Sequence, residues 1–136
     1  MTLKNSTITK GFIAAAIMNI GGVLTFSRFF TNSAIPDFDP VVLSNFGLLM
    51  IVVWGFAYLS VSKHYSQVKW LVGVFSVEKF IYGFFWTKWM LNNDLSAVYA
   101  KDTMAGIFYT IYGINDWIFF IFFFYVFVRL MSQNNR

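Results

Sequence analysis

The chain has 136 residues and a formal net charge of +4, and 58% of its residues are hydrophobic, 22% aromatic and only 12% charged. Soluble domains carry about 25% charged residues, so this composition disfavours a water-soluble globule and predicts a single all-α integral membrane domain over residues 1–136. The chain has one histidine and no cysteine, which excludes thiol chemistry, and we expect no metal and no cofactor.

The first predicted membrane helix covers residues 11–30 and follows a polar, basic N-terminal stretch. A basic start before an apolar run is also typical of a secretory signal. The small residues Ala14–Ala16 lie early in the run rather than after it, however, which favours a membrane helix. The run contains Asn19 and the pair Gly21 and Gly22. Two adjacent glycines indicate either a close-packing site or a break in the helix, and the sequence leaves both open.

The second predicted membrane helix covers residues 41–62. The carboxylate of Asp39 can accept hydrogen bonds from the free N–H groups of the first turn, and Pro40 suits the first helical position. A stripe of residues spaced by four follows along this helix: Gly47, Ile51 and Gly55. Such a stripe allows another helix to approach closely.

A short basic loop, residues 63–69, leads to the third predicted membrane helix, residues 70–91. A connection this short predicts that the second and third helices are antiparallel neighbours. The stretch from Trp70 to Trp89 spans about 30 Å, the thickness of a bilayer core. Its midpoint carries Glu78 and Lys79 side by side.

The remaining elements are a short interfacial helix and a fourth membrane helix. The interfacial helix is predicted over residues 94–101, with Asp94 as its cap. The fourth membrane helix is predicted over residues 105–130, with Asp102 or Thr103 as its cap. The expected architecture is therefore an antiparallel bundle of four transmembrane helices.

The loops carry an uneven distribution of basic residues. Six lie in the termini and in the loop between the second and third helices: Lys4, Lys10, Lys63, Lys69, Arg129 and Arg136. The other two connections carry three: Arg28, Lys88 and Lys101. Because basic residues are retained on the cytoplasmic side, we predict that both termini are cytoplasmic, in a bacterial inner membrane. Basic residues at the ends of apolar runs suit contacts with lipid headgroups. They form no basic stripe of the kind that binds nucleic acid.

Polar residues recur at the midpoints of three of the four predicted spans: Asn19, Glu78, Lys79, Asn115 and Asp116. Adjacent helical residues point about 100° apart, so the two members of the central pair face different neighbours. Lys79 shares a face with small residues and is expected to pack against another helix and pair with Asp116. Glu78 shares a face with Tyr82 and is expected to face a cavity, together with Asn19 or Asn115.

Ionisable groups inside a membrane are costly and usually mark function. We therefore predict a ligand or proton site made of six residues: Glu78, Lys79, Asp116, Asn115, Asn19 and Tyr82. The alternative is an internal polar network that holds the helices in register and performs no chemistry.

The favoured functional hypothesis is a protein that binds a lipid-like or other apolar small molecule, or a membrane partner, in an aromatic-lined pocket. The expected lining is Tyr82, Tyr109, Tyr112 and Trp117, with Glu78 and Asp116 as polar anchors. An alternative is a dimeric proton-coupled transporter. Size and a central glutamate resemble small multidrug transporters in outline, but those carry the glutamate in the first helix, where this chain has Asn19. A membrane-embedded isomerase with two carboxyls as acid and base is a third possibility, and no triad, metal motif or phosphate loop supports it.

Overall fold

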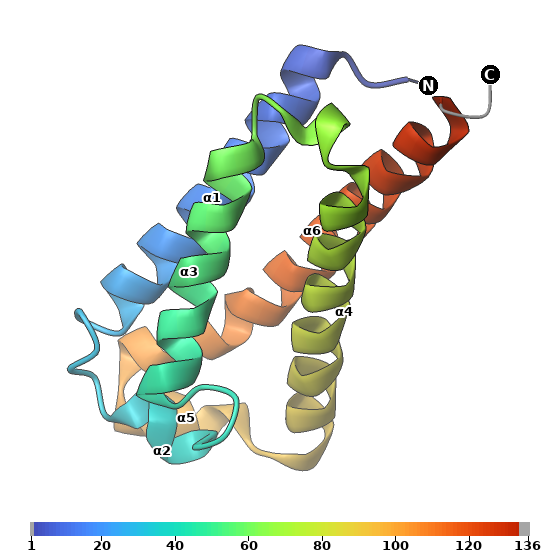
Figure 1. The fold of residues 1–136 in the computed structure, drawn as a ribbon. Coiled ribbons are helices and arrows are strands. Elements are labelled where there is room, and N and C mark those ends of the chain that lie inside the picture. Colours follow the sequence, from blue (N-terminus) through green and yellow to red (C-terminus); the bar gives the residue numbers. More distant parts are fainter. Residues whose placement is uncertain (1, 134–136) are drawn as a thin grey trace.

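The computed structural model describes residues 2–133 as helices joined by short connections, with no strand in that part of the chain (Figure 1). The elements in chain order are α1 (Asn5–Phe26), α2 (Ala34–Phe38), α3 (Asn45–Val61), the 3-10 turn η1 (Tyr65–Gln67), α4 (Lys69–Asn92), α5 (Leu95–Lys101) and α6 (Thr103–Gln133). The predicted all-α class is confirmed. Two of the helices, α1 and α6, are long and apolar enough to cross a membrane, and α3 is apolar but shorter.

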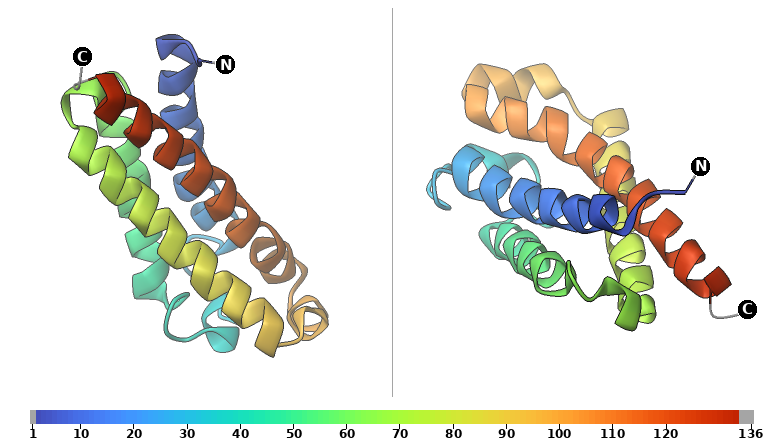
Figure 2. Two further views of the ribbon diagram at one scale, coloured as in Figure 1. Left: turned by 90° about the vertical axis from the view of Figure 1, so that its right-hand side faces the viewer. Right: turned by 90° about the horizontal axis from the view of Figure 1, so that it is seen from above.

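The long helices α1, α3, α4 and α6 alternate in direction, and the short helices α2 and α5 lie together at one end (Figure 1). Helix α4 packs mainly on α6, and α3 packs mainly on α1. Contacts between α1 and α6 join the two pairs, so that α1 lies between α3 and α6 when the molecule is seen from above (Figure 2). The start of α1 and the end of α6 lie at the same end, where the hydroxyl of Tyr125 accepts a hydrogen bond from the N–H of Leu3 at 3.2 Å.

The second and third predicted helices are antiparallel and their side chains meet, as at Tyr58 and Phe75, but neither has its main interface with the other. The extensive interface of α3 is with α1 and that of α4 is with α6. A short connection fixes the direction of the returning helix, whereas side chains decide which surfaces meet. At Gly55 an added Cβ would lie 3.2 Å from the carbonyl oxygen of Ala16, so this glycine lets α3 approach α1. At Gly113 an added Cβ would overlap the ring of Trp86, which places α4 against α6.

The first predicted helix ends earlier than expected. Helix α1 stops at Phe26 rather than residue 30 because Arg28, Phe29 and Phe30 adopt positive φ angles of 48°, 54° and 66°. L-residues enter this left-handed region only where other contacts hold them. Here the hydroxyl of Ser27 accepts the N–H of Phe30 at 3.0 Å, which closes the turn.

The second predicted helix begins later than expected, at Asn45 rather than residue 41. The carboxylate of Asp39 accepts the N–H of Val42 at 3.0 Å and so caps a turn that does not continue as a helix. Ser44 is the true cap, and its hydroxyl accepts the N–H of Gly47 at 3.0 Å. An added Cβ at Gly47 would meet the carbonyl oxygen of residue 42 in the same turn, so only part of the predicted stripe serves helix packing.

Both predicted caps in the second half of the chain are confirmed. The carboxylate of Asp94 accepts the N–H of Ser96 at 2.9 Å at the start of α5. The carboxylate of Asp102 accepts the N–H of Ala105 at 2.8 Å at the start of α6. Helix α5 therefore lies within one residue of its predicted bounds.

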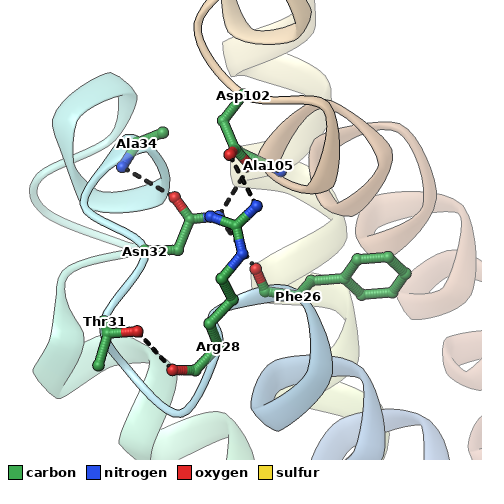
Figure 3. Close-up of polar contacts among 7 residues, drawn as sticks. All are labelled: Phe26, Arg28, Thr31, Asn32, Ala34, Asp102 and Ala105. Carbon is green, nitrogen blue, oxygen red and sulfur yellow. Dashed lines mark hydrogen bonds and ion pairs between the residues drawn. The ribbon is translucent and has the colours of Figure 1, made fainter.

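Asp102 also ties the turn after α1 to the start of α6 (Figure 3). Its carboxylate forms an ion pair with Arg28 at 3.0 Å and accepts the side-chain amide of Asn32 at 2.9 Å. The same amide donates to the carbonyl oxygen of Phe26 at 3.1 Å. The N–H of Ala105, with the Asn32 amide and the Arg28 guanidinium, holds the pKa of the Asp102 carboxyl below its ordinary value.

The lowered pKa of Asp102 predicts a stability contribution that depends on pH. A carboxyl whose folded pKa is depressed stabilises the fold above its unfolded pKa, near 3.8, and loses this contribution as the pH falls through the lowered folded value. We expect Asp102→Ala to lower the unfolding free energy by about 1–2 kcal/mol at pH 7. Thermal unfolding in detergent should show this difference shrinking below pH 4, and a difference independent of pH would contradict the role of the carboxylate.

Candidate functional site

The predicted central lysine lies at the junction of three helices. Lys79 of α4 is 1% exposed, and its ammonium donates to the Asp116 carboxylate of α6 and to the Asn19 carbonyl oxygen of α1, each at 2.8 Å. The predicted pairing of Lys79 with Asp116 is confirmed. The Asn19 amide in turn donates to the backbone carbonyl oxygen of Ile51 in α3 at 3.0 Å. One continuous hydrogen-bonded chain therefore joins all four long helices, and we call these residues the Lys79 network.

The Lys79 network satisfies groups that are expensive to bury. A buried ion is tolerated only when its charge is paired and its donors find acceptors. The Lys79 ammonium has two acceptors and also lies 5.4 Å from the centre of the Tyr58 ring, within range of a cation–π interaction. These contacts explain how a lysine fits into an otherwise apolar helix.

Glu78 has a different hydrogen-bond partner from Lys79, as expected from the rotation between adjacent helical residues, although Tyr58 lies near both. Its carboxylate accepts a hydrogen bond from the hydroxyl of Tyr58 in α3, and both side chains are buried. Tyr58 is the main site residue absent from the sequence-based prediction. The signal was present, because Tyr58 follows Gly55 by three residues and so continues the face that starts at Ile51.

A groove of about 260 Å³ lies between α3 and α4, and we call it the α3–α4 groove. Its lining consists of Trp54, Val74, Val77, Glu78, Ile81 and Tyr82. The lining of this groove includes both Glu78 and Tyr82, which share a face of α4 as expected. Asn19 and Asn115 do not line this groove, since the first belongs to the Lys79 network and the second lies on the other side of it.

A second opening of about 370 Å³ lies between α1 and α6, and we call it the α1–α6 pocket. Most of its walls are apolar, and its polar lining residues are Asn19, Thr25, Tyr112, Asn115 and Asp116. Gly21 and Gly22 also line it, in an unbroken stretch of α1. An added Cβ at either glycine would meet nothing within 4 Å, so these glycines form neither a close-packing site nor a helix break. They leave space that the pocket occupies.

Tyr112 has an unusual environment within this pocket. Its hydroxyl is buried and is the one buried side-chain polar atom in residues 2–133 without a hydrogen-bond partner. The ring stacks on Phe108 with centroids 5.3 Å apart, which holds the side chain in place. Leaving a buried hydroxyl unpaired costs about 1–3 kcal/mol, so Tyr112 would gain stability from any hydrogen-bond acceptor that reached its hydroxyl.

The predicted aromatic lining is divided between different environments. Tyr112 lines the α1–α6 pocket and Tyr82 lines the α3–α4 groove. Tyr109 is buried against α2, where its hydroxyl donates to the carbonyl oxygen of Ile35 at 2.7 Å. The indole of Trp117 donates to the hydroxyl of Thr87 at 3.0 Å. The expectation of one pocket lined by all four rings is therefore wrong, because two of them make contacts between helices.

No group of three or more His, Asp or Glu side chains that could hold a metal ion occurs in the described part of the chain. The polar groups of the site include one ion pair, the Asn19 amide that is bonded to it, one carboxyl–tyrosine pair and one unpaired hydroxyl.

The Lys79 network predicts a stability effect that depends on which partner is removed. Asp116→Leu leaves the buried ammonium uncompensated, and we expect a loss of about 3–5 kcal/mol of unfolding free energy. The double substitution Lys79→Met with Asp116→Leu removes both charges and should recover most of this loss. Equilibrium unfolding in mixed detergent micelles measures both variants. Ile118→Leu, at an exposed position of α6, is the matched control, with an expected effect below about 1 kcal/mol.

If the double variant were no more stable than Asp116→Leu, the ion pair would not be what holds Lys79 in the bundle.

Comparison of the chain with protein-family models, with curated protein sequences and with solved structures finds no match to any of them.

Proposed function

We propose that this chain is an integral membrane protein whose four long helices cross the bilayer and which binds an apolar small molecule in the α1–α6 pocket. Support for the membrane setting comes first from α1 and α6, which have the length and apolarity of spanning helices. The other two long helices expose large apolar side chains: Phe46, Leu49, Val53, Phe56, Leu59, Leu71, Val74, Val77, Phe80, Ile81, Phe84 and Phe85. Since Glu78 and Lys79 point inward, the outer surface of α4 suits lipid despite its charged pair.

The proposed orientation has both termini in the cytoplasm of a bacterial inner membrane. The beginning of α1, the loop around η1 and the end of α6 lie at one end of the bundle (Figure 1), and this end carries most of the basic loop residues. Basic residues near the ends of membrane helices are retained in the cytoplasm. Helices α2 and α5 would then lie at the outer surface.

The orientation predicts the reactivity of an introduced cysteine. The natural chain has no cysteine, so Asp37→Cys provides a unique thiol at the α2 end. A membrane-impermeant maleimide added to intact cells should label this thiol, because α2 lies on the outer side in the proposed orientation. Ser66→Cys in η1 is the matched control and should react only after the membrane is opened. The reverse pattern would refute the orientation.

The observation that carries the ligand proposal is the apolar α1–α6 pocket itself, whose lining includes Tyr112, a residue with a buried and unpaired hydroxyl. The pocket volume of about 370 Å³ lies in the range of small-molecule sites, about 300–1,000 Å³. Its walls favour an apolar body, and the hydroxyl favours one oxygen acceptor, such as a carbonyl or an alcohol group. Asp116 is neutralised by Lys79, so a neutral ligand is preferred over an ion. These features together favour a lipid-like molecule with a single polar end.

The isomerase and transporter alternatives have less support. An acid–base pair must act at one opening, whereas Asp116 lines the α1–α6 pocket and Glu78 lines the α3–α4 groove. The hypothesis of a proton-coupled transporter is supported by Glu78 alone.

The ligand proposal predicts which variants lose bound molecules. Protein purified in mild detergent should retain an apolar molecule that mass spectrometry of the organic extract identifies. Gly22→Leu places a side chain in the open space of the pocket and should abolish retention without lowering the melting temperature of the empty protein. Tyr112→Phe removes the hydrogen-bond donor and should weaken binding about 10-fold. Val53→Leu, on the exposed face of α3, is the control with unchanged retention.

Equal retention by wild type and Gly22→Leu would refute the α1–α6 pocket as the site. An unchanged melting temperature with every lipid, quinone and sterol of a test panel would also refute it.

A further inference from the structure

A groove of about 380 Å³ lies at the end of the bundle that carries α2 and α5, and we call it the Asp39–Lys88 groove. The chain between α2 and α3 forms one wall, with Asp39 and Val41, and the last turns of α4 form the other, with Phe85, Lys88 and Asn92. Figure 1 shows both segments at the same end of the bundle. The groove shares no lining residue with the α1–α6 pocket, so it is a separate site.

Trp89 of α4 holds the two walls of this groove together. Its indole N–H donates to the carbonyl oxygen of Phe38 at 3.0 Å, and its ring contacts that of Tyr109 with centroids 4.6 Å apart. Asp39 follows Phe38 directly, and its carboxylate accepts the N–H of Val42 at 3.0 Å. Hydrogen bonds on both sides of Asp39 in the sequence therefore fix its position beside α4.

The groove contains two opposite charges that do not pair with each other. Asp39 is half-buried and Lys88 is exposed, and the ion pairs of residues 2–133 involve other side chains. The side-chain amides of Asn92 and Asn93 donate to the carbonyl oxygens of Lys88 and Trp89, at 2.7 and 3.0 Å, which leaves their own oxygens as acceptors. The end of α4 also carries a partial negative charge. The groove thus combines several acceptors with a single ammonium group.

The lining changes from polar to apolar in the order in which a phospholipid does. Phe85, Lys88 and Asn92 are three or four residues apart and lie on one face of α4. Asn92 is the last residue of the helix, and Phe85 lies about 10 Å further along the axis toward the middle of α4. Phe85 is 42% exposed, and Val41 on the other wall is 81% exposed. A headgroup therefore fits at Lys88 and Asn92, with the start of an acyl chain on Phe85 and Val41.

From this arrangement we propose that the Asp39–Lys88 groove binds the headgroup of phosphatidylethanolamine. The primary ammonium of the lipid donates to the Asp39 carboxylate and to the asparagine oxygens, and its phosphate pairs with the Lys88 ammonium. Binding exchanges no covalent bond and needs no second reactant. The inference rests on the membrane setting of the proposed function, but on neither its orientation nor the ligand of the α1–α6 pocket.

Other headgroups fit the groove less well. Phosphatidylcholine carries the same two charges, but its quaternary ammonium has no N–H to donate to Asp39 or to the asparagine oxygens. Phosphatidylglycerol is anionic and offers no cation to Asp39. Soluble phosphoethanolamine has the charges of the proposed headgroup but lacks the chains that would contact Phe85 and Val41, so it serves as an arm of the test.

The test is native mass spectrometry of the full chain, delipidated in mild detergent, with equal amounts of the three lipids carrying identical acyl chains. Wild-type protein should bind phosphatidylethanolamine about 5-fold more tightly than either other lipid, the discrimination expected of a half-buried charged hydrogen bond. Asp39→Asn keeps an oxygen acceptor for the N–H of Val42, and it should reduce the preference over phosphatidylcholine to below about 2-fold. Lys88→Gln removes the partner of the phosphate and should weaken all three lipids alike.

The matched control is Asp94→Asn, because Asp94 also accepts an N–H at the start of a helix and lies outside the groove. This variant should keep the wild-type preference. An unchanged preference in Asp39→Asn, or its loss in Asp94→Asn, would overturn the proposal. Displacement of the lipid by an equal concentration of phosphoethanolamine would also overturn it, since the groove would then bind a soluble ligand.

A failure of the membrane setting gives a different result from a failure of the groove. Release of the chain from membranes by alkaline carbonate would refute the membrane setting and this inference with it. A chain that stays in the membrane but prefers none of the three lipids would refute the groove alone.

Discussion

The structure depends on the need to satisfy one buried ammonium group. Lys79 lies in an apolar environment where each unpaired charge costs several kcal/mol, so Asp116 and Asn19 must reach it. Because these residues belong to α6 and α1, the requirement fixes the depth and rotation of three helices relative to one another. The bond from Asn19 to the carbonyl oxygen of Ile51 extends the constraint to α3. Apolar packing alone allows helices to slide, whereas this network specifies one register.

The sequence was sufficient to predict this constraint but not its surroundings. The common depth of the polar residues and the 100° between adjacent positions led to the pairing of Lys79 with Asp116, since both arguments rest on helix geometry alone. Tyr58 was missed because a tyrosine in an apolar run is also compatible with a lipid-facing position. Its place on the face of Ile51 and Gly55 indicates that it points to another helix, but not that it bonds Glu78. The early end of α1 was missed because Phe29 and Phe30 resemble a continuing membrane helix, while long-range contacts of Asp102 hold the turn.

Glycines illustrate why a residue type does not determine a role. Gly55 is required where α3 meets the backbone of α1, and Gly113 is required where α6 meets an indole of α4. Gly22 faces open space instead, so a side chain there would fill the pocket without moving a helix. From sequence, all three are small residues in apolar helices and favour close packing equally. The difference arises from which face each helix presents to its partner, and that depends on the register set by the Lys79 network.

The same network determines the different chemistry of the two openings. The centre of the bundle contains two carboxyls, on Glu78 and Asp116, and a single ammonium on Lys79. Since α4 directs the ammonium toward α1 and α6, the carboxyl at the α1–α6 pocket is neutralised, and that pocket is left with an unpaired hydroxyl as its most distinctive polar group. The carboxyl at the α3–α4 groove is not neutralised by an ion pair. The direction of one side chain therefore makes the two openings differ in charge and in their polar groups.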